Sequence, residues 1–276
     1  MTSPVLLTGG TGTLGRRVAP RLREAGRPVR VLSRRTRPAE EGLEFVTGDL
    51  ATGDGIDAAL TGVETVVHCA GDAKNDERTT RTLAQAAARA GVRHLVSISV
   101  VGADRVPVVS AVDRAMFGYF AAKRAAEQVV SGSGLPWTTL RASQFYDLVL
   151  TVVGQLARLP LIPVPAGLRF QPVDTGDVAD RLVELALGEP AGLVPDFAGP
   201  RVYGLDELLR GYLRASGRRR PLVPVRLAGG AYRAVRDGAL LARDEARDGA
   251  RDGQAGHRTW EDFLAERMAA EGRAAR

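Results

Sequence analysis

The stretch Thr8-Gly9-Gly10-Thr11-Gly12-Thr13-Leu14-Gly15 decides the fold of this chain. Its glycines at 10, 12 and 15 have the spacing G-x-G-x-x-G, with an apolar run at 5–7 before them and an amphipathic stretch at 14–25 after them. A glycine turn between a strand and a helix allows a tight reversal and leaves free amides at the helix N-terminus, where an anion binds. The sequence therefore predicts a strand, a phosphate-binding loop and a helix in this order.

The first two-thirds of the chain repeats this alternation of strand and helix. Further runs have the apolar, β-branched composition of strands: 29–32, 43–47, 65–69, 94–99 and 137–141. The stretches between them have the spacing of helices: 55–60, 78–90 and 115–131. Several runs are apolar without alternation, as in strands covered on both faces. We therefore predict an α/β protein with a doubly wound parallel sheet, a Rossmann fold that binds a dinucleotide.

After about residue 142 the pattern becomes irregular, because prolines interrupt it at 160, 163, 165 and 172. Helices are expected at 177–187, with Asp177 as N-cap, and at 205–215, 227–241 and 260–270. The Arg-, Asp- and Gly-rich segment 243–256 is expected to be an exposed loop. We divide the chain into an NADP-binding Rossmann core, 1–142, and C-terminal segments, 143–276, that form a small α/β substrate-binding lobe packed on the same fold.

Composition excludes several classes of protein. A single cysteine, Cys69, can form neither an internal disulfide nor a cysteine-based zinc site, which fits a reducing, cytoplasmic setting. The apolar stretch 148–168 contains an arginine and three prolines, so no membrane span is expected, and no export signal is visible. The net charge of +6 is mostly spread as alternating Arg and acidic residues, so no nucleic-acid partner is expected.

Metal and serine-hydrolase chemistry are not expected either. The three histidines, His68, His94 and His257, have no metal-ligand spacing to one another or to carboxylates. His68 and His94 lie in strand-like runs, where a core or strand-edge position is expected. No G-x-S-x-G turn exists for a nucleophilic serine.

The end of the second strand-like run distinguishes between two nucleotides. About twenty residues after the glycines, where NAD sites carry an acid for the ribose hydroxyls, this chain has Ser33, Arg34 and Arg35. Two arginines favour the 2′-phosphate of NADP(H), although an ordinary Arg-rich surface would look the same. Asp49 is either an acceptor for the adenine amino group or a loop cap. The expected cofactor-binding residues are Gly9, Gly10, Thr11, Gly12, Thr13, Leu14, Gly15, Ser33, Arg34, Arg35, Asp49, Leu50, Cys69, Ala70, Gly71 and Lys123.

The segment Tyr119-Phe120-Ala121-Ala122-Lys123 places a tyrosine and a lysine on one face of a helix. Only Lys74 and Lys123 are lysines in a chain that otherwise uses Arg, which makes this spacing unusual. A lysine charge favours the phenolate, so that a tyrosine can exchange a proton with a carbonyl oxygen. The alternative is an exposed helix pair without chemistry.

Together with 97–102 and the phrases at 133–147 and 170–180, these motifs resemble the short-chain dehydrogenase/reductases, in particular their atypical, NmrA-like and isoflavone-reductase-like NAD(P)H-binding branch. The resemblance covers most of the chain and is weakest at 222–256. It implies Tyr119 as general acid/base, Lys123 as its partner and Ser99 as the hydroxyl that orients a carbonyl. The family often has two adjacent serines there, whereas Ile98 separates Ser97 from Ser99 here, so either serine is a candidate to face the nicotinamide.

The segment after the last strand-like run is expected to bind the substrate. Gln144, Phe145 and Tyr146 would line a mostly apolar pocket, although the two aromatic residues could equally begin a core helix. The leading hypothesis is an NADPH-dependent reductase of a small apolar carbonyl, quinone, imine or enone. A non-catalytic NADP(H) sensor of the NmrA-like kind and a nucleotide-sugar epimerase or dehydratase are the alternatives.

Overall fold

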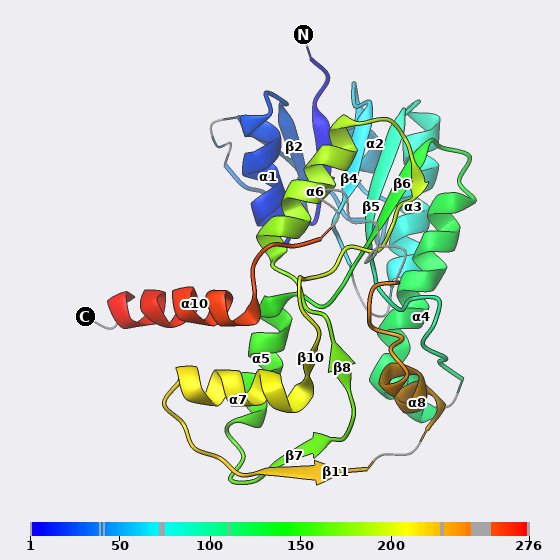
Figure 1. Cartoon of the computed structure of the whole chain (residues 1–276). Helices are drawn as coiled ribbons and strands as arrows, with labels where there is room; N and C mark the ends of the chain where they lie inside the picture. The colour runs from blue at the N-terminus through cyan, green and yellow to red at the C-terminus, as the bar shows by residue number, and fades with distance from the viewer. Residues whose placement is uncertain are drawn as a thin grey trace.

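A parallel sheet of seven strands forms the centre of the molecule (Figure 1). The computed structural model describes residues 2–38, 40, 42–71, 75–109, 111–226, 229–243 and 255–274. The strands of this sheet are β1 (Val5–Thr8), β2 (Val29–Ser33), β3 (Leu43–Thr47), β4 (Thr65–His68), β5 (His94–Val100), β6 (Trp137–Ala142) and β9 (Gly192–Leu193). Their order is β3-β2-β1-β4-β5-β6-β9. The order reverses between β1 and β4, which confirms the predicted doubly wound Rossmann fold.

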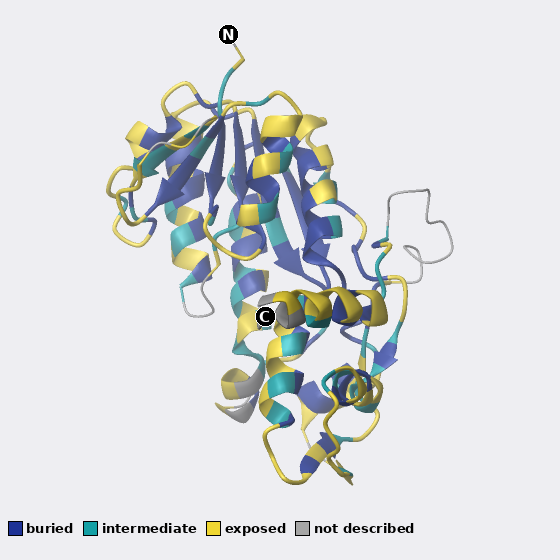
Figure 2. Ribbon diagram, turned by 90° about the vertical axis from the view of Figure 1, so that its left-hand side faces the viewer, coloured by how far each residue is buried: buried dark blue, intermediate teal, exposed yellow. Residues whose placement is uncertain are grey.

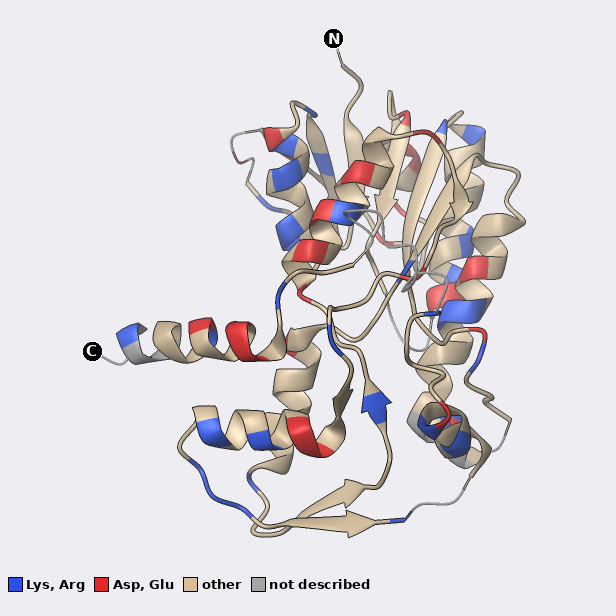
Figure 3. Ribbon diagram, viewed as in Figure 1, with Lys and Arg blue, Asp and Glu red and all other residues tan. Residues whose placement is uncertain are grey.

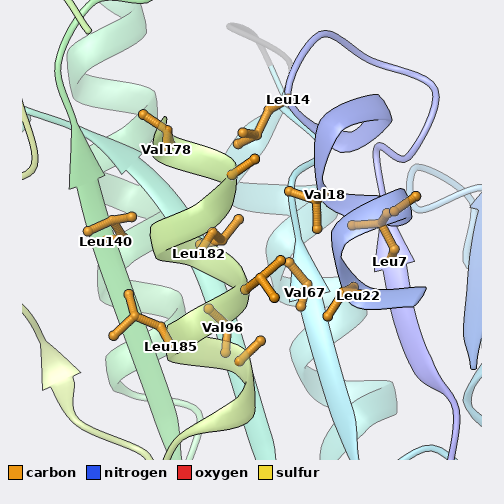
Figure 4. Close-up of a cluster of buried hydrophobic side chains, with 14 of the residues drawn as sticks. Leu7, Leu14, Val18, Leu22, Val67, Val96, Leu140, Val178, Leu182 and Leu185 are labelled. Carbon is orange, nitrogen blue, oxygen red and sulfur yellow. The ribbon is translucent and has the colours of Figure 1, made fainter. Parts of the chain in front are cut away.

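Helices cover both faces of the sheet. They are α1 (Gly15–Glu24), α2 (Ile56–Leu60), α3 (Asp76–Arg89), α4 (Ala111–Ser131) and α6 (Thr175–Leu187). On one face, Val18 and Leu22 of α1 and Leu182 of α6 pack against the strands (Figure 4). On the other face, α2, α3 and the end of α4 contribute to a second buried cluster. The central strands β1, β4 and β5 lie buried between these two layers, as their continuous apolar runs predicted (Figure 2). The edge strands β3 and β9 are partly exposed.

The remaining elements form the lobe below the sheet in Figure 1. They are α5 (Tyr146–Leu156), β7 (Ile162–Pro165), β8 (Arg169–Phe170), β10 (Tyr203–Gly204), α7 (Leu205–Ala215), β11 (Leu222–Val225), α8 (Gly230–Arg236) and α10 (Trp260–Ala274). β7 pairs in parallel with β11, and β8 pairs antiparallel with β10. The lobe has its own apolar core around Tyr146, Trp260 and Phe263. Not every element after residue 142 belongs to the lobe. Helix α6 packs on the sheet, and β9 is one of its strands.

Several predicted boundaries need correction. Helix α6 begins at Thr175, and its N-cap is Asp174, whose Oδ1 accepts from the Gly176 amide at 2.6 Å. Asp177 instead accepts from the His257 amide at 2.7 Å and so fixes the chain before α10. The expected helix 227–241 is only seven residues long, α8, with 227 and 228 outside the described residues. Most of the expected loop 243–256 also lies outside them.

Short strands of the lobe were not predicted, because β7 and β11 contain prolines at 163, 165 and 224. Proline has no amide to donate, but each of these strands pairs on one side only, so an outward-facing proline breaks no ladder bond. Among the helices that the structure describes, none is long and apolar enough to cross a membrane.

Candidate cofactor and active site

The glycine loop at the end of β1 is held by contacts that only glycine allows. Gly9 has a φ of +68°, and a Cβ at this residue would lie 2.5 Å from the Ala70 amide nitrogen. A Cβ on Gly15 would lie 2.2 Å from the Gly9 carbonyl oxygen. The two glycines therefore let the loop pack on the end of β4 and let α1 start directly against it.

Gly12 differs, because its missing side chain faces away from the protein. A Cβ built there meets only the Gly9 oxygen, at 3.2 Å. Thr11, Gly12 and Thr13 are exposed, and the amides of Thr13 and Leu14 donate to no other described residue. Unbonded amides at the N-terminus of α1, beside a residue without a side chain, fit the pyrophosphate of a dinucleotide.

Basic side chains follow at the end of β2, one strand away from the loop. The Ser33 hydroxyl donates to the Arg35 carbonyl at 2.8 Å, which folds the chain into a turn. This turn exposes Arg34 and Arg35, and neither guanidinium has an ion-pair partner among the described residues. Two unneutralised guanidiniums beside the nucleotide loop suit a further phosphate.

The remaining residues that were predicted to bind the cofactor follow β3 and β4. Asp49 caps its loop, since its Oδ1 accepts from the Ala51 amide at 2.8 Å, and no partner of Oδ2 is seen in the described chain. Leu50 is buried in the core beneath. At the end of β4, the Ala70 amide donates to the Thr8 hydroxyl, and burial raises the pKa of the Cys69 thiol to about 12. Cys69 is therefore a neutral wall residue and not a nucleophile.

Helix α4 brings Tyr119 and Lys123 to the end of β4. A Cβ on Gly71 would lie 3.1 Å from the Lys123 Nζ, so the ammonium rests directly against this strand end. The same nitrogen lies 5.8 Å from the centre of the Tyr119 ring. Lys123 is 5% exposed and Tyr119 is 42% exposed, so the tyrosine is the member of the pair that a substrate can reach.

The charges near Tyr119 shift the pKa of its phenol in opposite directions. Burial raises the pKa of the Tyr119 phenol, Lys123 opposes this, and Asp76 adds to it. The carboxylate of Asp76 forms an ion pair with Lys123, with 2.9 Å between Oδ2 and Nζ. The predicted lowering of the tyrosine pKa by lysine is therefore outweighed, and the phenol is protonated at neutral pH.

Both candidate serines are bonded to protein groups. The Ser99 hydroxyl donates to Glu127 Oε1 at 2.6 Å, and Ser97 shares a hydrogen bond of 2.8 Å with Thr139. Glu127 lies one helical turn after Lys123 and receives two hydrogen bonds of 2.7 Å from the guanidinium of Arg141 on β6. Ser99 thus ties β5 to α4, which the family pattern alone did not indicate.

The three predicted substrate residues have different positions. Tyr146 starts α5, is fully buried in the lobe core, and donates its hydroxyl to the Arg258 carbonyl at 2.8 Å, so it does not line a pocket. Phe145 is half-buried against the core of the sheet. Both amide atoms of Gln144 are shielded from solvent, and neither has a hydrogen-bond partner within the described chain. A shielded amide without a partner is costly, and a bound molecule would satisfy it.

His68 and His94 are buried and hydrogen-bonded within the sheet layers, as their strand-like runs predicted. His68 Nδ1 bonds to Thr8 at 2.7 Å and Nε2 bonds to Thr80 at 3.1 Å, and burial lowers its pKa to about 4. His94 bonds to Thr138 at 2.8 Å. In the described part of the chain, no three His, Cys, Asp or Glu side chains are grouped to hold a metal.

A run of arginines between residues 210 and 220 lies in the lobe, on α7 and on the segment that follows it (Figure 3). These arginines line a surface cavity of about 550 Å³. The arginines of this cavity are Arg210, Arg214, Arg218, Arg219 and Arg220. They are not part of the edge where β1, β2 and β4 end.

Fold and site together define a dinucleotide-binding protein of the Rossmann class. A family model described as NAD(P)H-binding matches residues 9–188, well over half of the chain. The chain therefore belongs to this NAD(P)H-binding family, which agrees with the predicted NmrA-like branch of the short-chain dehydrogenase/reductases. Its cofactor is NAD(P)H.

Curated relatives carry several different names. A (4-alkanoyl-5-oxo-2,5-dihydrofuran-3-yl)methyl phosphate reductase of Streptomyces griseus is 38% identical over 152 residues, 53% of this chain and 50% of that protein. A ceramide reductase of Caulobacter vibrioides is 31% identical over 239 residues, 79% of this chain and 72% of that protein. The photosystem II assembly factor Ycf39 of Synechocystis is 26% identical over 232 residues, 77% of this chain and 68% of that protein. The chain spans only about half the length of the first two relatives that it matches.

Among solved structures, the NADPH complex of the quinone oxidoreductase QOR2 from Escherichia coli superposes with a TM-score of 0.76. The alignment covers 95% of this chain and 99% of that one, at 18% identity. This likeness shows the fold. The reductase names and the family model support an oxidoreductase in general terms.

Proposed function

We propose that the chain is an NADPH-dependent reductase that transfers hydride to a small, mostly apolar carbonyl, quinone, imine or enone, with Tyr119 as proton donor. One observation carries the proposal. Lys123 is buried against Gly71 at the edge of the nucleotide site, while Tyr119, one helical turn away, is accessible. A proton donor and the proposed cofactor site thus meet at the carboxyl end of the sheet, where such folds bind their ligands.

In this proposal, different residues bind the cofactor and transfer the proton. The amides after Gly12 would hold the pyrophosphate, and Arg34 and Arg35 would hold the 2′-phosphate that distinguishes NADPH from NADH. Bound NADPH supplies the hydride. Lys123 would bind the nicotinamide ribose, and Tyr119 would donate its proton to the substrate oxygen as negative charge develops there.

Apolar side chains favour an apolar substrate. Phe117 and Phe120, on the helix of Tyr119, pack with Val235 of α8 and Phe170 of β8 in one cluster. The reacting face of α4 therefore adjoins the lobe through apolar contacts. Gln144, with its unbonded amide, is the polar group that we assign to the carboxamide of the cofactor or to the substrate.

Turnover tests the proposal. We would follow NADPH oxidation by the purified chain with a panel of quinones, enones, imines and aldehydes, beside the variant Tyr119→Phe. We expect turnover of at least one class and a loss of about 10²- to 10⁴-fold in kcat for the variant. Turnover at the same rate in both proteins would remove Tyr119 from the mechanism.

A sensor or assembly role is the second candidate, because one relative is named as an assembly factor. It predicts tight NADPH binding without turnover of any class in the panel. Under that outcome Tyr119→Phe would leave the cofactor affinity unchanged and the reductase proposal would be abandoned.

A further inference from the structure

Asp76 is buried beside Tyr119 and Lys123, although the proposed mechanism does not use it. It is 1% exposed, and its Oδ2 lies 2.9 Å from the Lys123 nitrogen. A Cβ on Gly71 would lie 3.1 Å from this nitrogen and 3.6 Å from Asp76 Oδ1, so the ion pair touches the end of β4. Asp76 begins α3 and Lys123 lies on α4, so the pair joins two packed helices at the edge of the site.

In the described part of the chain, the charges that act on the Tyr119 phenol are those of Lys123 on α4 and Asp76 on α3, and Lys123 also acts on His68 and Cys69 at the end of β4. Burial lowers the pKa of His68 to about 4 and raises that of Cys69 to about 12, so both are neutral near pH 7. Among these four groups, the one negative charge, on Asp76, therefore balances the one positive charge, on Lys123.

This balance adjusts the acidity of Tyr119 in addition to the effect of burial, which is the larger cause. An unopposed ammonium would favour the phenolate, which accepts a proton and suits oxidation of an alcohol. Asp76 opposes this effect at short range. A buried carboxylate also fixes the position of the lysine nitrogen through an ion pair of 2.9 Å.

We propose that Asp76 is a positioning residue, which holds the Lys123 ammonium at the end of β4 and opposes ionisation of the Tyr119 hydroxyl, as suits the reducing direction. The inference rests on the proposed function for the use that is made of this proton. In the reducing step, hydride adds to the substrate carbon, the π electrons of the C=O bond move to oxygen, and the Tyr119 O–H bond breaks to protonate that oxygen. The phenolate then recovers a proton from water, which the 42% exposure of Tyr119 allows.

The experiment measures the ionisation of Tyr119 directly and needs no substrate. The full chain is labelled with ¹³Cζ-tyrosine, and the Tyr119 resonance is assigned by its loss in Tyr119→Phe. We would titrate the wild type, Asp76→Asn and Asp76→Glu, with Asp57→Asn as control because Asp57 pairs with Arg89 on the exposed surface. We expect the Tyr119 pKa to fall by about one unit in Asp76→Asn and to stay near the wild-type value in the other two.

A second pair of variants avoids an unpaired buried lysine. Lys123→Met keeps the Asp76 carboxylate, whose ionisation is followed by the ¹³Cγ resonance of labelled aspartate, and the two variants are compared at a pH where it is ionised. Asp76→Asn/Lys123→Met removes both charges together. The double variant should have the lower Tyr119 pKa, again by about one unit. An equal Tyr119 pKa in these two variants, or an unchanged or higher value in Asp76→Asn, would overturn the inference. Because the readout is spectroscopic, a failure to find a reducible substrate would bear on the proposed function and not on Asp76.

Discussion

The glycine loop at the end of β1 and the core of the lobe are built in opposite ways. In the loop, the contacts of Gly12 and Gly15 are with backbone atoms a few residues away, while Gly9 packs on the backbone of Ala70 and Gly10 on the side chain of Val31. In the lobe, Tyr146 packs against Trp260 and Phe263, more than a hundred positions along the chain, and the rings of the last two stack 5.6 Å apart. A binding loop can therefore be recognised from a short motif, whereas the lobe depends on side chains that meet only in the folded chain.

The largest effect is expected in the lobe. Trp260 is fully buried, and its indole nitrogen donates to the Leu208 carbonyl at 3.3 Å. Trp260→Ala should lower the free energy of unfolding by about 4 kcal/mol, because it leaves a large cavity. Urea unfolding monitored by circular dichroism measures the loss.

The same variant tests whether the core 1–142 folds separately from the lobe. Trp137 on β6 remains as the fluorescent reporter of the sheet. If the two parts are distinct, Trp260→Ala should keep its NADPH affinity within about threefold while the lobe loosens. If the variant loses NADPH binding at the same denaturant concentration at which the lobe unfolds, the core and the lobe form one folding unit. The contrast between an independent binding loop and a separate lobe would then be wrong.

For the glycine loop, substitutions of Gly12 and Gly15 separate an effect on folding from an effect on cofactor binding. Gly15→Ala should destabilise the protein by about 3 kcal/mol and abolish cofactor binding, since its Cβ would overlap the Gly9 carbonyl. Gly12→Ala should fold almost normally, because its Cβ meets one atom at 3.2 Å, yet it should weaken NADPH binding at least about tenfold. Thermal unfolding and cofactor titration separate the two effects. Equal destabilisation by both variants would show that the loop is scaffold only.

A smaller effect is expected where side chains, not backbone, contact the nucleotide. Arg34→Ala should weaken NADPH binding about tenfold, or 1.4 kcal/mol, and leave NADH binding unchanged. Fluorescence titration with both nucleotides measures this, with Arg158→Ala as control because Arg158 is exposed on the lobe. A parallel loss for NADH would argue against a 2′-phosphate site at the end of β2.

The sequence predicted the sheet well, because buried parallel strands are continuous apolar runs and glycines follow several of them, as after β1, β3, β4 and β5. It missed β7 and β11, whose prolines normally exclude a strand. Tyr119 and Lys123 were predictable as a pair since four-residue spacing is local. Asp76 and Glu127 were not: their partners lie on other elements, and no periodicity brings α3 or β6 to α4.

The central claim is that Tyr119 donates the proton while NADPH donates the hydride. We would supply NADPH deuterated at C4 of the nicotinamide to the wild type and to Tyr119→Phe, with the best substrate of the panel, and measure deuterium in the product and the cofactor affinity of both proteins. We predict deuterium on the substrate carbon, equal NADPH affinity, and a rate at least about 10²-fold lower in the variant. Deuterated product formed equally fast by Tyr119→Phe, or tight NADPH binding with no transfer by the wild type, would contradict the account.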